Sequence, residues 1–487
     1  MPASSISGAW RWWRRASNRW WILFLLLFSV RFFLLLAALD PEEERIGNFV
    51  DCAGLEWKNG PSRPLYDREE LYAGACAQAI LRGAGLPWSS YRFMPYGSGS
   101  LVLSVAAVPW VAVAGTSYLA WKILPLLLSV AGGLVWVALV RRWWGTTAAA
   151  WMALLYLFAP PVLVRTLLIA KGDHAEAAVL VGCVLLVACR AVDSDGRRRL
   201  FGAGLAGLLA GVSIFITYSA APILAGVALV WGLSVRLRPA RLWIAAGAGL
   251  LLGLVPWVWT LAATGGGAVN VYGRFLGAPV DPVAIGQRLG VLAGQGLLAA
   301  FEVPGGALVR ALAGLFWFVL VIAGFVGLLR RARSLPPRLA ATGLVAHVAA
   351  FCVLAPDASS RYLIPAYPLF LLAVATLAAS GRDQHDSRGD RRHPENGASQ
   401  TPPRRAPGHR RLSKTAAALA VVLGVTSWLS SVARPHAPDL PSLAGADWDL
   451  WGEVVGTKLT HGQIGQVPRE MRGYLWVGYG KRVFYQR

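Results

Sequence analysis

Charged side chains are scarce in this sequence, and acidic ones are scarcer than basic ones. Asp, Glu, Lys and Arg make up 15% of the 487 residues, against 56% hydrophobic residues and a mean hydropathy of +0.50. A soluble domain carries about 25% charged residues, so this composition excludes an ordinary soluble protein. Apolar runs of about 20 residues can cross a bilayer as α-helices. The sequence therefore predicts an all-α polytopic membrane protein.

The charges that do occur are mostly basic, with 47 Lys and Arg against 25 Asp and Glu. A nucleic-acid-binding protein gathers such charge on one face or along one helix. Here the Arg residues form short clusters between apolar runs instead. Short loops rich in Lys and Arg stay in the cytoplasm. We therefore interpret the clusters as topology signals and expect no nucleic-acid partner.

Cysteine is sparse as well, with 5 residues and no CxxC pair or zinc-ligand spacing. Three of them, Cys183, Cys189 and Cys352, fall in apolar runs, whereas Cys52 and Cys76 share the first polar loop. A disulfide between Cys52 and Cys76 would require this loop to face an oxidising compartment. The sequence leaves that pairing open.

The basic clusters, together with apolar run length, define the expected spans. Residues 21–39 follow a basic N-terminus, and they form a run too long for a signal peptide and without a cleavage site, so we expect them to remain as the first span. The expected topology has about eleven transmembrane helices. They are expected at residues 21–39, 118–140, 146–164, 176–192, 200–217, 219–235, 241–262, 307–329, 339–355, 361–379 and 415–432.

The expected topology places the N-terminus in the cytoplasm and the C-terminus on the extracytoplasmic side. Residues 101–115 are short for a span and contain Pro109. Counting them as a full crossing would move the basic cluster at 141–145 outside, so we interpret them as a re-entrant or juxtamembrane helix. The first outer loop then carries juxtamembrane helices before the second span begins.

Two basic clusters flank residues 200–235, which must therefore cross twice and turn near Tyr218 and Ser219. A second long polar stretch, rich in Pro, Gly and charge, is expected to be a disordered cytoplasmic loop. The expected organisation is a transmembrane catalytic module at 1–380, this disordered basic loop at 381–414, a last transmembrane helix at 415–432 and a small extracytoplasmic tail at 433–487.

Polar residues gather in three short segments on the expected outer side: "YDREEL" (66–71), "AKGDHAEA" (170–177) and "SSRYLIPAYP" (359–368). The first precedes an apolar stretch typical of a helix lying on the membrane surface. The side chains of interest are Asp67, Glu69 and Glu70 in the first segment, Lys171, Asp173, His174 and Glu176 in the second, and Arg361 and Tyr362 in the third.

This combination suits a reaction in which a hydroxyl attacks a carbon that bears a phosphate leaving group. A carboxylate can accept the hydroxyl proton as general base. Arg or Lys can bind the phosphate and stabilise the charge that grows on it as the bond breaks. A phosphate-linked lipid sugar would supply that group at this depth.

Each residue also has a purely structural interpretation. Acidic residues in an outer loop are often only solvated, and Arg361 at a span end could extend its charge to the interface. His174 could be an interfacial hydrogen-bonding residue, and His347, inside a span, is expected to be packed. Arg31, near the middle of the first span, must be shielded by neighbouring helices or water.

The motifs resemble the GT-C superfamily of membrane glycosyltransferases, in particular the family 39 type, which includes protein mannosyltransferases and the lipid A aminoarabinose transferase. The resemblance rests on "EELYAGACAQAILRG" followed by "FMPYGSGSL", on "KGDHAE" and on "RYLIP". Aligned on "ILRG", the catalytic Asp of the family falls on Glu69, with Glu70 beside it. Because Glu69 departs from Asp, Asp67 remains the alternative base.

The resemblance implies an inverting transferase that moves a sugar from a polyprenyl-phosphate donor to an acceptor hydroxyl on the extracytoplasmic face. It implies donor-phosphate binding by Arg361, Tyr362 and Lys171, and a second acidic motif at Asp173, His174 and Glu176. The acceptor would be a glycan, a lipid or a protein, and membrane lipids surround the chain. We expect an integral protein of a bacterial inner (plasma) membrane.

Metal dependence differs within the family that the motifs resemble. Two adjacent carboxylates could hold Mg²⁺ or Mn²⁺. Lys171 and Arg361 could instead neutralise a phosphate monoester unaided, so we expect no obligatory metal.

Two rival functions stay open at this point. A transporter or lipid flippase tends to show internal repeats and ionisable groups near the membrane midplane. The sequence shows no repeat, and Arg31 is the exception among charged residues that otherwise lie at span ends. A non-catalytic assembly partner with the same fold is the second rival, because Glu69 departs from the pattern.

Overall fold

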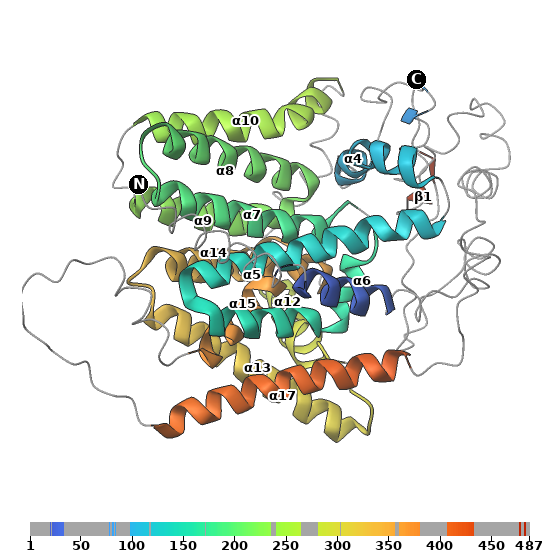
Figure 1. The fold of residues 1–487 in the computed structure, drawn as a ribbon, viewed down its shortest axis with the longest axis vertical. Helices are drawn as coiled ribbons and strands as arrows, with labels where there is room; N and C mark the ends of the chain where they lie inside the picture. Colours follow the sequence, from blue (N-terminus) through green and yellow to red (C-terminus); the bar gives the residue numbers. More distant parts are fainter. Residues whose placement is uncertain are drawn as a thin grey trace, which may run out of the picture.

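The structure, a computed structural model, is a bundle of apolar α-helices (Figure 1). It describes residues 20, 22–33, 77, 80–81, 83, 98–115, 118–170, 172–234, 240–263, 281–301, 303–355, 360–379, 407–432, 477–478 and 482–483. Cys52 and Cys76 lie outside these residues.

The regular elements in the first half of the described chain are all helices. A helix at Ile22–Phe33 precedes α4. The following elements are α4 (Ser98–Ala114), α5 (Tyr118–Leu157), α6 (Pro161–Leu167), α7 (His174–Val192), α8 (Gly196–Ile216), the short η2 (Tyr218–Ala220), α9 (Ala221–Ser234) and α10 (Ala240–Ala263).

The second half continues the bundle. Its elements are α12 (Pro282–Val291), the π-helical η3 (Leu292–Leu298), α13 (Ala307–Arg330), α14 (Leu335–Leu354), the 3-10 helix η4 (Ser360–Ala366), α15 (Tyr367–Ala378) and α17 (Pro407–Val432). A single antiparallel pair, β1 (Val477–Gly478) with β2 (Arg482–Val483), is the sheet that the described residues contain.

The expected all-α polytopic fold is confirmed. Within the described residues, 7 helices are long and apolar enough to cross a membrane, and shorter apolar helices occur at Ile22–Phe33, Val102–Ala114, Tyr218–Ser234 and Ser413–Leu429. Every span expected from the sequence falls on one of these helices. Val102–Ala114 corresponds to the expected juxtamembrane helix and contains Pro109.

The helix α5 contains two of the expected spans, because it folds back on itself at Gly145. Gly145 has φ 86° and ψ 178°, a backbone conformation that strongly favours glycine. The hydroxyl of Tyr156 donates to the carbonyl oxygen of Ser129 at 2.9 Å. In a straight helix these residues would lie about 40 Å apart, so the contact shows that the two parts of α5 pack side by side.

The second part of α5 is interrupted at Pro160 and Pro161, which begin α6 after a short gap. In a continuous helix the carbonyl of Tyr156 would accept from the amide of residue 160, but proline has no N–H. Arg31 from the first helix donates to that carbonyl through Nη2 and is fully buried. The expected shielding of Arg31 is confirmed, and its local role is to satisfy a carbonyl that water cannot reach.

Helix α17 also contacts the interruption between α5 and α6. Trp428 donates from Nε1 to the carbonyl of Ala159 at 3.1 Å. A Cβ added at Gly424 would lie 2.1 Å from the carbonyl oxygen of Phe158, so the close approach requires glycine. An unsatisfied carbonyl costs several kcal/mol in hydrocarbon. The helix Ile22–Phe33 and α17 therefore stabilise the interruption between α5 and α6, which precedes the second polar segment.

Helices α8 and α10 pack backbone to backbone at one edge of the bundle, α17 lying along the opposite edge (Figure 1). A Cβ at Gly207 would meet the carbonyl oxygen of Ala246 at 2.0 Å, and one at Gly249 would meet that of Gly204 at 2.0 Å. Small residues repeated at this spacing let membrane helices approach closely. The pair fixes the end of α8, which leads into η2.

Burial distinguishes the centre of the bundle from its lipid-facing rim. In the most apolar part of the span Ser360–Ala378, 89% of residues are buried, against 11% in Ala240–Trp259. The α10 residues Ile244, Leu251 and Leu252 are more than half exposed, which suits contact with lipid chains. Arg361 and Tyr362 therefore stand at the entrance to the most enclosed span.

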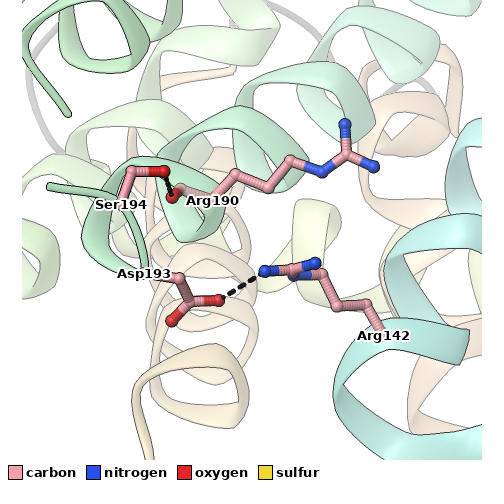
Figure 2. Close-up of polar contacts among 4 residues, drawn as sticks. All are labelled: Arg142, Arg190, Asp193 and Ser194. Atoms are coloured by element: carbon pink, nitrogen blue, oxygen red, sulfur yellow. Dashed lines mark hydrogen bonds and ion pairs between the residues drawn. The ribbon is translucent and has the colours of Figure 1, made fainter. Parts of the chain in front are cut away.

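A contact between two helix ends agrees with the expected placement of their loops on the same side of the membrane. Arg142 donates to Asp193 at 2.9 Å, joining the fold-back of α5 to the end of α7, both expected in the cytoplasm (Figure 2). In the same view the side chain of Arg190 extends away from Asp193, while Ser194 donates to the Arg190 carbonyl at 2.8 Å. The 19 residues of α7 span about 28 Å, close to the thickness of the hydrocarbon layer.

One boundary differs from the expectation. Helix α17 begins at Pro407, inside the stretch 381–414 that was expected to be a disordered loop. The residues from Pro407 to Lys414 are basic and polar, so apolar periodicity could not reveal a helix that extends beyond the hydrophobic run. The described end of α17, Val432, coincides with the expected end of the last span.

Candidate functional site

The structure describes part of the expected site. Asp173, His174, Glu176, Arg361 and Tyr362 belong to the described residues, whereas the three acidic residues of the first loop and Lys171 lie outside them. The roles of Asp67, Glu69, Glu70 and Lys171 therefore stay predictions.

The first loop is described at a few positions after its acidic residues. Ala77, Ile80 and Leu81 are helical, and Ala77 is fully buried. Gly83, the glycine of "ILRG", has φ 90° and donates its amide to the carbonyl of Ile80 at 3.0 Å. These contacts are those of a helix end capped by glycine. That this helix lies on the membrane surface stays a prediction.

The second acidic motif forms the N-terminus of α7. Both oxygens of the Glu176 carboxylate accept backbone amides, from Gly172 at 3.0 Å and from Asp173 at 2.9 Å. Asp173 is the N-cap residue, and negative charge is favourable at this end of a helix. Glu176 therefore holds the turn that presents Asp173 and His174, and a direct substrate contact by Glu176 stays a prediction.

His174 meets the third polar segment across the bundle. Its ring lies edge to face against Tyr362, with centroids 5.2 Å apart and an interplanar angle of 83°. Arg361 donates from Nη2 to the Tyr362 hydroxyl at 2.9 Å, and its guanidinium carbon lies 4.9 Å from the centre of the same ring. The structure thus brings "KGDHAE" and "RYLIP" together at one end of the bundle.

A residue of α14 binds the backbone of η4. His347 is 2% exposed, and its Nε2 lies 2.9 Å from the carbonyl oxygen of Tyr362. Tyr367, just after η4, donates to the carbonyl of Gly296 in η3 at 2.7 Å. His347 is packed, as expected, and it also fixes the segment that carries Arg361.

The hydroxyl residues beside His174 were not among the residues predicted for the site. The Nδ1 atom of His174 lies 2.7 Å from the Ser219 hydroxyl and 3.4 Å from the Thr217 hydroxyl. Both come from the turn between α8 and α9, which the sequence predicts as a turn near Tyr218 and Ser219. The sequence does show polar residues that interrupt a long apolar run at this turn. It does not show that the turn packs against the start of α7.

The described corner combines two carboxylates, Asp173 and Glu176, with an imidazole, a guanidinium and a phenol. Such donors suit a phosphate oxygen: guanidinium and hydroxyl groups donate to it, and charge-assisted bonds of this kind are roughly twice as strong as neutral ones. Within the part of the chain that the structure describes, no group of three or more His, Cys, Asp or Glu side chains could hold a metal ion. Binding of Mg²⁺ or Mn²⁺ stays a prediction that depends on the first loop.

Comparison with known proteins gives a likeness of structure alone. No protein-family model and no curated protein matches the chain. The chain is similar to apo ArnT from Cupriavidus metallidurans, with 16% identity, 91% of this chain and 78% of that chain covered, and a TM-score of 0.49. The chain is also similar to ArnT from the same organism bound to undecaprenyl phosphate. Identity is 17%, 94% of this chain and 78% of that chain are covered, and the TM-score is 0.47.

A third similar structure is the Archaeoglobus fulgidus oligosaccharyltransferase tethered with an acceptor peptide. Identity is 16%, coverage is 85% of this chain, and the TM-score is 0.44. The chain spans 56% of the length of that oligosaccharyltransferase. Since the TM-scores lie below 0.5, the activity of this chain has to be judged from its own residues.

Proposed function

We propose that the chain is an inverting glycosyltransferase that moves a sugar from a polyprenyl-phosphate donor to an acceptor hydroxyl on the extracytoplasmic face of the membrane. The observation that carries the proposal is the meeting of His174 with Tyr362, whose hydroxyl accepts from Arg361. Two motifs far apart in the sequence form one polar corner at the end of an apolar bundle, where the phosphate of a membrane lipid would lie.

The roles follow from the chemistry of each group. Arg361 and the Tyr362 hydroxyl, with Lys171, bind the donor phosphate and stabilise the charge that grows on it as the glycosidic bond breaks. Asp173 and His174 orient the sugar or the acceptor from the start of α7. Glu69, with Glu70 beside it or Asp67 in its place, removes the proton from the acceptor hydroxyl. The hydroxyl oxygen attacks the anomeric carbon, and the phosphate leaves with the bonding electron pair.

The buried charge of Arg31 fits this proposal better than a transport function. An ionisable group at mid-membrane commonly lies on an ion pathway. Arg31 instead donates to the Tyr156 carbonyl that Pro160 leaves without an amide donor, and its guanidinium lies 5.6 Å from the Tyr156 ring centre. These contacts give Arg31 a structural role.

The experiment is mass spectrometry of the envelope glycans, lipids and glycoproteins from cells with and without the chain. We expect one sugar to be missing from one acceptor class, and the lipid-linked donor to accumulate. Restoration by wild type and by Arg310→Ala, but not by Arg361→Ala, would support the proposed site. Arg310 is an exposed arginine on α13, so it controls for loss of positive charge. Identical glycan profiles with and without the chain would contradict the proposal.

A further inference from the structure

We propose that Ser219, supported by Thr217, is a positioning residue that fixes the ring of His174 in the site, an inference that rests on the proposed glycosyltransferase function. The turn between α8 and α9 would then form a third wall of the corner made by the start of α7 and by η4. This turn contributes hydroxyl groups, and none of its residues belongs to the three polar segments described above.

The contacts converge on one ring nitrogen. Nδ1 of His174 lies 2.7 Å from Oγ of Ser219, a short hydrogen bond, and 3.4 Å from Oγ1 of Thr217. The two hydroxyls lie 3.1 Å from each other. His174 is 6% exposed, so bulk water cannot easily replace either hydroxyl. A small polar network of this kind holds its members in one arrangement.

The turn itself is built to be rigid. Thr217 ends α8 in an extended conformation, with φ −155° and ψ 134°, and its hydroxyl accepts the backbone amide of Ser219 at 3.4 Å. Helix α8 is fixed in turn by its close glycine contacts with α10. The Ser219 hydroxyl therefore approaches His174 from a position set by the fold.

Tyr362 fixes the ring from a second direction. Its ring stands at 83° to that of His174, and its backbone carbonyl is bound by His347. The imidazole is thus held by a hydrogen bond at Nδ1 and by an aromatic edge contact. A serine hydroxyl can donate to Nδ1 or accept from it, so this bond fixes the orientation of the ring in either tautomer. Ser219 would in this way set the orientation in which His174 meets the sugar or the acceptor.

The elements packed at and against α7 carry several charged and titratable groups. They are Asp173 and Glu176 on α7 itself, Arg361 and Tyr362 on η4, His347 on α14, Tyr218 on η2, Lys122 on α5 and Arg165 on α6. The Tyr218 hydroxyl accepts from Nε1 of Trp257 on α10. Ser219 and Thr217 add no charge to this set, so replacing them changes the orientation and hydrogen bonding of His174 without adding or removing a charge.

The test compares Ser219→Ala with Ser219→Thr and with Ser213→Ala. Ser213 is a fully buried serine of α8 whose hydroxyl has no hydrogen-bond partner among the described residues, so it controls for loss of a buried hydroxyl. The full chain is labelled with ¹⁵N-histidine in lipid nanodiscs. The His174 signals are identified by their loss in His174→Gln. Sugar transfer is measured against pH in parallel.

We expect the ¹⁵N signals of His174 to shift in Ser219→Ala, because Nδ1 loses its hydrogen bond with Ser219. Transfer should fall by about 5- to 10-fold in kcat/KM for Ser219→Ala, the loss of one positioning hydrogen bond, with a displaced pH profile. Ser219→Thr should recover most of both properties, and Ser213→Ala should alter neither.

Unchanged His174 signals in Ser219→Ala would overturn the inference, whatever the activity. If no polyprenyl-phosphate sugar is used by the wild type, the proposed function fails. The ¹⁵N spectra still decide in that case whether Ser219 positions His174.

Discussion

The rings of His174 and Tyr362 meet edge to face, 5.2 Å between centroids, although they come from opposite halves of the sequence. His174 begins α7, and Tyr362 lies in the 3-10 helix that leads into the most buried span. This contact joins the second acidic motif to the arginine-bearing segment. The site therefore depends on how the helices pack as much as on the motifs themselves.

Arg361→Ala should weaken use of the lipid donor more than turnover. Hydrogen bonds to charged groups contribute about 1.5–3 kcal/mol, so the KM for a polyprenyl-phosphate sugar should rise by about 10- to 100-fold. Arg361→Lys should retain part of the binding because it keeps the charge and loses the planar donors. Initial rates in proteoliposomes, with Arg310→Ala as control, measure the effect. Equal KM values for wild type and Arg361→Ala would remove Arg361 from the phosphate site.

Glycine packing between α8 and α10 gives a matched pair of variants on one helix. A Cβ at Gly249 would lie 2.0 Å from the carbonyl oxygen of Gly204, whereas one at Gly247 would meet nothing within 4 Å. Gly249→Ala should therefore destabilise the protein by about 1–3 kcal/mol through overpacking. Gly247→Ala should leave stability unchanged or raise it slightly. Thermal unfolding in nanodiscs distinguishes them, and equal melting temperatures would argue against the tight α8–α10 contact.

Arg31 and Pro160 should be energetically coupled. Arg31→Met leaves the Tyr156 carbonyl without its donor, but Pro160→Ala supplies a backbone N–H at the position that would normally bind it. The double variant should thus be more stable than the sum of the single effects indicates, by about 1–2 kcal/mol. A double-mutant cycle of unfolding measures the coupling. Additive effects would show that the carbonyl contact does not stabilise the fold.

The sidedness of the chain is tested with topology reporters. A reporter fused after residue 436 should be extracytoplasmic, because an odd number of expected spans separates it from a cytoplasmic N-terminus. A reporter inserted at residue 395, in the long basic stretch, should be cytoplasmic and serves as control. A cytoplasmic signal at 436 would overturn the assignment of the polar corner to the outer side.

Much of the fold was predictable because membrane-spanning helices can be recognised in a sequence by the length and apolarity of their runs. The turn at Tyr218 and the juxtamembrane helix around Pro109 followed from basic clusters and parity. The interruption at Pro160 was missed because the run 146–164 was assigned from its apolarity, although Pro160 and Pro161 are residues that break a helix. The extension of α17 back to Pro407 was missed because its first residues are polar.

The candidate site was predictable in its motifs and not in its geometry. The chemistry of "KGDHAE" and "RYLIP" indicated a phosphate-binding corner, and the structure brings their described residues together. Ser219 and Thr217 were not predicted as site residues because a hydroxyl at a turn normally caps the backbone. Their approach to His174 depends on the tertiary packing of α8 against α7.

The most direct test of the account is the rate of sugar transfer from a polyprenyl-phosphate donor in proteoliposomes, measured for wild type, Glu69→Gln and Asp67→Asn. A general base contributes roughly 10²- to 10⁴-fold, so one of the two variants should lose at least about 100-fold in rate and thereby identify the base. Full activity in both variants, and in Arg361→Ala, would contradict the assignment of this corner and the first outer loop as the active site.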